Sequence, residues 1–297
     1  MLESKRMDRI GIAGAGRLGQ ALGRLLRDRG QPVVAIAGRD SGRTVSAAAY
    51  ISKDVLPVSY AELPSLASRV LICVPDDALE SVACTLASSP QPISIAVHTC
   101  GSRGAEALTA LESRGTSCAT LHPVQTIASP EQGVADLPGS SFGITGSGRA
   151  AEWALDIVCL LDGHALSIAP ENRPLYHAAA VVASNYIVAI IDAAVILMGQ
   201  AGVPREGALQ ALAPLVRASV KNALEAGPVQ ALTGPIERGD ERTVAAHLCA
   251  LDTSVDNVPE SVRQLYRQAG LHALEIARRK TPAVDRGKIE SLLRRGA

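Results

Sequence analysis

The stretch Arg9-Ile-Gly-Ile-Ala-Gly14-Ala-Gly16-Arg-Leu-Gly19-Gln-Ala-Leu-Gly23 decides the fold of the first half of the chain. It consists of an apolar strand, the spacing G-x-G-x-x-G and the start of a helix. Gly14 permits a tight turn, Gly16 lets a phosphate approach the backbone, and Gly19 lets the helix lie close to the strand. Free N–H groups at the helix start attract a pyrophosphate, whereas the alternative is a glycine-rich turn without a ligand. The residues predicted to bind a dinucleotide are Gly14, Ala15, Gly16, Arg17, Leu18 and Gly19.

The residues after the second expected strand indicate which dinucleotide binds. The strand 33–37 is followed by Gly38-Arg39-Asp40-Ser41-Gly42-Arg43. The guanidinium of Arg39 can hold a 2′-phosphate through two hydrogen bonds, with Ser41 and Arg43 as helpers. Asp40 would serve the ribose of NAD only after a small shift in register. The sequence therefore predicts NADP in preference to NAD.

Short apolar runs alternate with helical stretches in the first half of the chain, and long helical stretches fill the second half. The expected strands are 9–13, 33–37, 70–74, 93–97, 117–121, 141–145 and 165–168. The expected helices of the second half are 173–201, 205–226, 243–251 and 259–279. Alternating strands and helices are typical of a doubly wound, mainly parallel sheet. We therefore predict an α/β domain over 1–169 and an all-α domain over 170–297.

Composition limits the class of partner. The 297 residues include 29 basic and 29 acidic side chains, and only 2% are aromatic. A neutral chain with few aromatic rings lacks the charged patch and the stacking surface of a nucleic-acid binder. The six cysteines are scattered, with no C-x-x-C pair and no zinc spacing, so no metal site is expected. A small molecule is the expected ligand.

Two segments bear on the location of the protein. The charged segment 1–8 lacks the apolar region of a secretory signal, so we expect a cytoplasmic protein. The segment 178–198 is apolar and about as long as a membrane span, but it includes Asn185 and Asp192. Polar groups are costly in hydrocarbon. We therefore expect this segment to be a buried helix, and we expect no membrane as a partner.

Another expected strand ends at the same edge of the predicted sheet. Val70-Leu-Ile-Cys-Val74-Pro75-Asp76 is a buried strand that runs into a loop at the carboxyl edge. Open α/β sheets bind their ligands at this edge. Val74 and Pro75 are therefore expected beside the nicotinamide or its ribose, although each could equally be only a strand end and a helix entry.

Several motifs together resemble a known family. They are the glycine loop, 70–76, His98-Thr-Cys-Gly101, Leu121-His-Pro-Val-Gln-Thr126, Tyr176-His177, Ala183-Ser-Asn185, Thr233-Gly-Pro235 and Arg238-Gly-Asp240. With them the chain resembles Rossmann-like NADP-dependent oxidoreductases of the 6-phosphogluconate dehydrogenase-like superfamily, in the branch whose C-terminal half is a domain of unknown function. The resemblance implies NADP binding, a helical domain that forms a homodimer and closes the active site, and reduction of a small carbonyl or imine. Some members resemble ketopantoate reductases.

The candidate catalytic residues are polar side chains near the expected site. His98 and His122 each end a predicted strand, where side chains reach the crevice, and a structural histidine is the alternative for either. Many members of the wider superfamily use a helix lysine as proton donor, but the segment 176–198 contains no lysine. His122, Tyr176 or His177 must then supply the proton or polarise the carbonyl.

Other polar residues are expected to orient the substrate. His177 and Ser184 lie two helical turns apart on one face of the expected helix, with Asn185 beside them. Burying this polar stripe requires partners, either a substrate or neighbouring helices. The loop from Thr233 to Arg238 can hold a carboxylate, with Asp240 as the cap of the next helix. The predicted substrate-binding residues are His98, Gln125, Ser184, Asn185, Thr233 and Arg238.

The sequence therefore predicts an NADPH-dependent reductase of a small 2-oxo acid or related carbonyl. One alternative is a non-catalytic NADP-binding sensor or regulatory protein, which the missing lysine favours. Another is a reductase that acts on an imine or a sugar acid. A phosphorylated sugar acid would need more positive charge in the anion pocket than Arg238 alone supplies.

Overall fold

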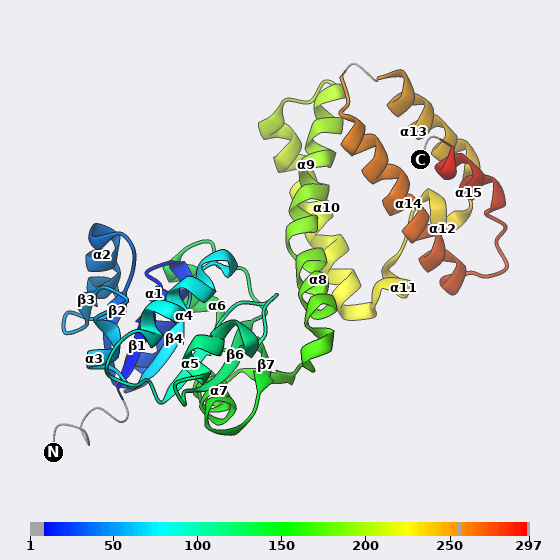
Figure 1. Cartoon of the computed structure of the whole chain (residues 1–297). Helices are drawn as coiled ribbons and strands as arrows, with labels where there is room; N and C mark the ends of the chain where they lie inside the picture. Colours follow the sequence, from blue (N-terminus) through cyan, green and yellow to red (C-terminus); the bar gives the residue numbers. More distant parts are fainter. Residues whose placement is uncertain (1–8, 255–256, 296–297) are drawn as a thin grey trace. The chain divides into compact units, whose positions relative to one another are not determined.

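The computed structural model describes residues 9–254 and 257–295, which belong to two compact units, Met1–Ser184 and Asn185–Ala297. The first unit contains an eight-stranded sheet in the order β3-β2-β1-β4-β5-β6-β7-β8 (Figure 1). The strands are β1 (Ile10–Ala13), β2 (Val33–Ala37), β3 (Leu56–Val58), β4 (Arg69–Ile72), β5 (Ile95–His98), β6 (Ser117–Pro123), β7 (Ser141–Gly146) and β8 (His164–Ser167). Neighbouring strands are parallel except β6 and β7, which pair antiparallel. The predicted doubly wound α/β fold is confirmed.

Every strand expected from the sequence is present, with bounds that differ by a few residues. The strand β3 was not expected. It is a three-residue edge strand that contains Pro57 and exposes Leu56, so it lacks the buried alternation by which a strand is recognised.

Apolar side chains of the central strands alternate between two cores, one on each face of the sheet. Ile10 and Ile12 of β1 pack in one core with residues of α1 (Arg17–Asp28), α2 (Ser41–Ile51) and α7 (Gly148–Leu160). Ala13 faces the other core, with residues of α3 (Leu63–Leu66), α4 (Leu79–Ala87) and α5 (Thr109–Glu112). The short helix α6 (Pro130–Asp136) packs beside α1. Because successive side chains point to opposite faces, helices on both sides bury every residue of such a strand.

Helices follow the sheet. They are α8 (Arg173–Ala183), α9 (Asn185–Gln200), α10 (Arg205–Ala226), α11 (Pro228–Ala231), α12 (Pro235–Arg238), α13 (Glu241–Thr253), α14 (Glu260–Lys280) and α15 (Gly287–Arg294). The change to helical structure occurs near Pro170, where the sequence places the domain boundary. The compact units nevertheless divide at Ser184, because α8 belongs to the first unit.

The prediction of one continuous helix over 173–201 is wrong. The chain leaves helical geometry at Ser184, with φ of −123° and ψ of −73°. Its hydroxyl donates to the carbonyl of Ala180 at 2.7 Å. Serine side chains compete for backbone groups in this way and bend or end helices. His177 and Asn185 therefore do not share a helix face, and Asn185 begins α9 in the second unit.

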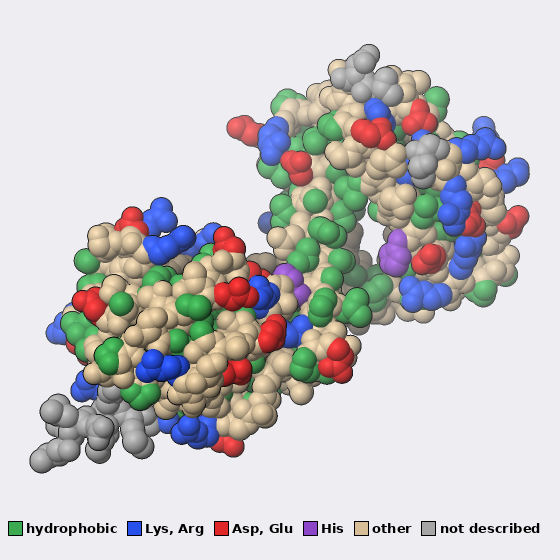
Figure 2. Space-filling model, in the orientation of Figure 1, with side chains coloured by type: hydrophobic (Ala, Val, Ile, Leu, Met, Phe, Trp, Pro, Cys, Tyr) green, Lys and Arg blue, Asp and Glu red, His purple; other side chains and the backbone are tan. Residues whose placement is uncertain are grey.

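The prediction that 178–198 is a buried helix is also wrong for the single chain. Val182, Val188 and Ile190 are at least half exposed, and of the residues of α9 only Ala193 and Val195 are buried. Hydrophobic side chains are visible along these helices in Figure 2. The stretch Pro170–Gln200 is also apolar and long enough to cross a membrane, by length and composition alone. Apolar composition shows that a segment avoids water, but it does not show what covers the segment.

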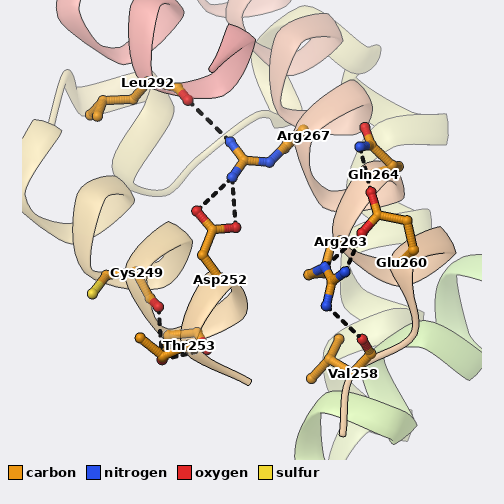
Figure 3. Close-up of polar contacts among 10 residues, drawn as sticks. Cys249, Asp252, Thr253, Val258, Glu260, Arg263, Gln264, Arg267 and Leu292 are labelled. Atoms are coloured by element: carbon orange, nitrogen blue, oxygen red, sulfur yellow. Dashed lines mark hydrogen bonds and ion pairs between the residues drawn. The ribbon is translucent and has the colours of Figure 1, made fainter. Parts of the chain in front are cut away.

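The second unit is helical and has its own small core, formed by Val244, Leu248, Leu274, Ile289 and Leu293. Polar contacts connect its helices (Figure 3). The guanidinium of Arg267 in α14 donates to both carboxylate oxygens of Asp252 at 2.8 Å and to the carbonyl of Leu292 at 3.2 Å. The predicted cap of α13 is confirmed, because the Asp240 carboxylate accepts a hydrogen bond from the backbone N–H of Thr243.

Candidate functional site

The glycine loop has the geometry that the sequence predicts. Gly14 has φ of +128°, and a Cβ there would lie 2.2 Å from the carbonyl oxygen of Cys73. A Cβ at Gly19 would lie 2.0 Å from the carbonyl oxygen of Gly14, so only glycine lets α1 start this close to β1. A Cβ at Gly16, by contrast, would meet no heavy atom of the described residues within 4 Å. This open side is where the backbone can receive a phosphate.

A cavity of about 270 Å³ adjoins the loop. Its lining includes the predicted residues Gly14, Ala15, Gly16, Arg39, Val74 and Pro75. Arg43 and Tyr60 also line it; Tyr60 follows β3 and gave no sequence signal. Asp40 is engaged elsewhere, because its carboxylate caps α2 by accepting the backbone N–H of Arg43 at 2.7 Å. The side chains beside the loop that remain suited to a phosphate are Arg39 and Arg43.

A second cavity, of about 410 Å³, lies at the carboxyl ends of β1, β4, β5 and β6. It shares Gly16, Val74 and Pro75 with the first cavity, and it also contacts Arg17 and Leu18. From later in the chain it adds Asp76, Gly101, His122, Gln125 and His177. A ligand at the glycine loop and a second molecule at His122 would therefore lie in adjoining cavities of one unit.

The structure brings together the three predicted catalytic residues. His122, near the end of β6, has Nδ1 2.7 Å from the Tyr176 hydroxyl of α8. The two rings meet edge to face, with centroids 5.5 Å apart, and the His177 ring lies 5.9 Å from that of His122. Gly143 provides the room, because a Cβ there would lie 2.4 Å from the Tyr176 hydroxyl.

The electrostatics of the cluster determine which atom carries which proton. Burial, with repulsion from His177 and Arg173, lowers the pKa of His122 to about 4, so the ring is neutral at pH 7. Burial also raises the pKa of Tyr176, which keeps its phenol protonated. We assign the phenol as the donor to Nδ1 at 2.7 Å, in preference to the carbonyl of His122 at 3.5 Å, and this assignment places the His122 proton on Nε2. Nε2 faces Gly101 on the cavity wall, 2.7 Å from the place of a Cβ there.

The prediction that His98 binds the substrate is wrong. The side chain is fully buried, its Nε2 hydrogen donates to the carbonyl of Gly104 at 2.9 Å, and its Nδ1 accepts the N–H of Cys100 at 3.2 Å. Burial lowers its pKa to about 4. Both ring nitrogens are used to shape the loop after β5, which is the structural alternative for this histidine.

Two residues of the cluster, Asp76 and Arg173, were not predicted from the sequence. Asp76 lies on the cavity wall and accepts a hydrogen bond from Ser102. Partial burial by itself would raise its pKa, but hydrogen bonds from Ser102 and Cys100, together with interactions with His177 and His98, hold the pKa below its usual value. Arg173 is buried behind the cavity and has no sequence motif of its own. The only signal for Asp76 was its position after a strand at the carboxyl edge.

The remaining predicted substrate residues are dispersed. Gln125 lines the second cavity, and its amide also contacts the Asp136 carbonyl at 3.3 Å. Ser184 ends α8, whereas Asn185, Thr233 and Arg238 belong to the second unit. Thr233 lines an apolar cavity of about 440 Å³ within that unit. Roles for these residues in substrate binding stay predictions.

The second unit contains a second histidine–tyrosine pair. His247 of α13 has Nδ1 2.8 Å from the Tyr266 hydroxyl of α14, with ring centroids 6.0 Å apart. His247 is exposed at the side of the apolar cavity. Within the described part of the second unit no glycine loop or cluster of metal ligands accompanies this pair.

Comparisons with known proteins also find two parts in the chain, but with a boundary earlier than Ser184. Residues 2–123 match the model of the Rossmann-like domain, and residues 140–273 match a domain of unknown function, DUF2520. No curated protein matches the sequence. The chain therefore combines a Rossmann-like domain with a DUF2520 domain, as the resemblance of its motifs implies.

Solved structures share the fold. BF3122 from Bacteroides fragilis, provisionally described as an NADP oxidoreductase, is 22% identical with a TM-score of 0.74, over 91% of this chain and 98% of that one. Protein TM1727 from Thermotoga maritima is 22% identical with a TM-score of 0.69, over 91% and 99%. A reductive aminase from Aspergillus terreus, in complex with NADPH and ethyl levulinate, is 18% identical with a TM-score of 0.66, over 97% and 98%.

Proposed function

We propose that the protein is an NADPH-dependent reductase of a small carbonyl or imine. The observation that carries this proposal is the His122–Tyr176 pair, which lies on the wall of a cavity that adjoins the glycine loop. The fold is shared with the provisional NADP oxidoreductase and with the reductive aminase. A 2-oxo acid is the first substrate class to test, and ketopantoate is its first member because some members of the family that the motifs resemble look like ketopantoate reductases.

The residues present fit a dinucleotide with a 2′-phosphate. At Gly14 there is no room for a side chain, and at Gly16 the backbone is open to an approaching pyrophosphate. Arg39 and Arg43 would hold the 2′-phosphate, and Val74 and Pro75 would lie beside the nicotinamide end. Bound NADPH would supply the hydride.

His122 and Tyr176 polarise the carbonyl group of the substrate. The Nε2–H of His122 donates a hydrogen bond to the oxygen of the bound carbonyl as negative charge develops on it. The oxygen takes its proton from Nε2 as Nδ1 receives the Tyr176 proton, and the phenolate, whose pKa is raised by burial, regains a proton from solvent to complete the cycle. A neutral imidazole and a phenol thus replace the helix lysine of other members of the superfamily. His177, beside them, contacts the substrate.

Asp76 favours an imine as the second substrate class. Its carboxylate stays ionised at the wall of the same cavity, since hydrogen bonds hold its pKa low. A negative charge there stabilises a protonated C=N group and disfavours a substrate carboxylate nearby. The charge of Asp76 therefore distinguishes the two substrate classes, because it attracts a protonated imine and repels the carboxylate of a 2-oxo acid.

The test is NADPH oxidation by the purified protein, followed by absorbance. Ketopantoate and other 2-oxo acids form one panel, and cyclic imines or a ketone with an amine form the other. We expect turnover with one panel and its loss in His177→Ala, while NADPH still binds. Binding of NADPH without consumption in either panel would overturn the reductase proposal and favour a nucleotide sensor.

The cofactor assignment has its own test in Arg39→Ala. Loss of a bidentate guanidinium–phosphate contact should weaken NADPH binding by about ten- to a hundredfold and leave NADH nearly unchanged, as measured by fluorescence titration. Equal weakening of both dinucleotides would contradict the assignment of Arg39 to the 2′-phosphate.

We also propose that the active form is a cytoplasmic homodimer. The apolar side chains that α9 and α10 expose, among them Val188, Ile190, Leu215 and Leu224, need a cover, and a second copy of the chain provides the same apolar surface. Analytical ultracentrifugation without detergent should give twice the mass of the chain. A monomer, or a protein that needs detergent, would contradict this proposal.

A further inference from the structure

Arg173, the first residue of α8, is buried and forms no ion pair with a described residue, although the charges of Glu106 and Asp76 act on it at longer range. Its side chain is 2% exposed. Nη1 donates to the hydroxyls of Thr120 and Thr145, each at 2.9 Å, and Nη2 donates to the carbonyls of Cys100 at 2.7 Å and Gly101 at 3.1 Å. Nε is buried and has no hydrogen-bond acceptor among the described residues. A buried cation held only by neutral groups is costly and calls for an explanation.

Burial alone does not distinguish Arg173. In the second unit Arg286 is 3% exposed, and it likewise donates to neutral groups, among them the carbonyls of Ile236 at 2.8 Å and Val284 at 3.0 Å. Arg286 connects the loop before α15 to α12. The partners of Arg286 differ from those of Arg173 in their neighbours. None of them adjoins His122, Tyr176 or His177, although one, the carbonyl of Glu237, precedes the predicted substrate residue Arg238.

Three of the four hydrogen-bond partners of Arg173 lead to the proposed active site, because Cys100 and Gly101 line its cavity and Thr120 lies close to His122, whereas Thr145 lines another cavity. Thr120 lies in β6, two residues before His122. Gly101 faces both His122 Nε2 and the His177 ring, since a Cβ there would lie 2.7 Å from the first and 2.5 Å from Cδ2 of the second. Tyr176 and His177 follow Arg173 by three and four residues, so they project from the same side of α8.

We propose that Arg173 is the positioning residue of the site, which fixes the strand of His122, the loop of Gly101 and the helix of Tyr176 and His177 relative to one another. The planar fork of the guanidinium reaches acceptors on three segments at once, which a lysine ammonium cannot do. Its charge also opposes protonation of His122. The expected effect on turnover rests on the proposed function. The claim that Arg173 holds these three segments in place does not depend on a substrate.

The experiment compares Arg173→Lys with Arg286→Lys in the full-length protein. Both substitutions keep the charge and lose a multidentate fork, so both should lower the unfolding temperature. Only Arg173→Lys should reduce kcat, by about ten- to a hundredfold, with little change in the NADPH Kd, because a small displacement of the reacting groups lowers the rate. Equal kcat values for the two variants would overturn the proposal.

A second readout needs no turnover. Nitrogen NMR of the His122 ring should show a neutral Nε2–H tautomer at pH 6 in the wild type and in Arg286→Lys. In Arg173→Lys the signal should move toward a mixture of tautomers or a protonated ring. An unchanged His122 signal in Arg173→Lys would overturn the proposal. A changed signal in a protein without reductase activity would support the positioning role while the proposed function failed.

Thr145→Val provides the test if Arg173→Lys does not fold. It keeps Arg173 and its charge, and it removes one acceptor of Nη1, although it also removes the hydrogen bond from Thr145 to Ile168. The His122 signal should shift in the same direction as predicted for Arg173→Lys, by a smaller amount. A folded Thr145→Val protein with the wild-type signal would count against the proposal.

Discussion

The two histidine–tyrosine pairs have nearly the same geometry in different surroundings. In both, a tyrosine hydroxyl meets Nδ1 of the histidine, at 2.7 Å for His122–Tyr176 and at 2.8 Å for His247–Tyr266, and the rings meet edge to face. His122 lies at the carboxyl edge of a sheet, in a cavity beside the glycine loop. His247 lies exposed on a helix, beside an apolar cavity.

The difference shows that the burial and charges around a histidine–tyrosine pair determine whether the pair can act on a substrate. Burial and neighbouring positive charge keep His122 neutral and direct its remaining N–H into a cavity. Its neighbours come from two other segments of the first unit, Arg173 and His177 from α8 and Asp76 from the turn after β4. We therefore expect one pair to act on a substrate and the other to contribute to helix packing.

Replacing the two histidines should give the largest contrast. His122→Gln removes the donor to the substrate oxygen, and kcat should fall by about a hundredfold to a thousandfold. His247→Gln should leave kcat within about twofold, because its pair only joins two helices. Steady-state NADPH oxidation measures both. Comparable losses in the two variants would contradict the distinction between the pairs.

Removing the phenol hydroxyls should have a smaller effect. Tyr176→Phe leaves His122 without the donor that fixes its tautomer, so kcat should fall by about tenfold, the equivalent of one hydrogen bond. Tyr266→Phe should leave kcat unchanged and lower the free energy of unfolding by about 1 kcal/mol. Full activity in Tyr176→Phe would show that His122 works without its partner.

Gly143→Ala displaces the tyrosine without altering it. The new Cβ would lie 2.4 Å from the Tyr176 hydroxyl, so the ring must move away from its place beside His122. A several-fold loss of kcat is expected. Gly270→Ala is the matched control in the second unit, where the new Cβ would lie 2.9 Å from a methyl of Leu293 and affect packing only. If Gly270→Ala lost as much kcat, the effect could not be assigned to Tyr176.

The last contrast concerns the pH dependence of stability. The pKa of His122 is about 4 in the folded protein and near 6.5 in the unfolded chain, so the unfolded chain gains a proton first as pH falls. Its contribution to stability is complete above about pH 6.5 and declines toward pH 4, by at most about 1.4 kcal/mol per pH unit. Denaturant unfolding between pH 6.5 and 5 should show a shallower slope in His122→Gln than in His247→Gln. Parallel slopes would indicate that His122 is protonated in the folded protein.

Much of the first unit could be predicted from local pattern. The glycine spacing fixed the strand–turn–helix unit, and apolar runs located the long strands, because these signals depend on neighbours along the chain. His122, Tyr176 and His177 were found through motifs of the resemblance and positions at strand ends. His98 was misassigned because its position at a strand end does not reveal that two backbone groups occupy its ring.

The sequence by itself determined the nucleotide loop, the alternation that builds a doubly wound sheet and the change to helices near Pro170. Only the tertiary structure decided that Ser184 ends a helix, that Asp40 is occupied as a cap and that Arg173 reaches three segments from inside the protein. The physical reason is the distance along the chain over which each signal acts. Turns and periodicity are encoded within a few residues, whereas burial, tautomer and charge balance at His122 depend on groups that meet only after the chain has folded.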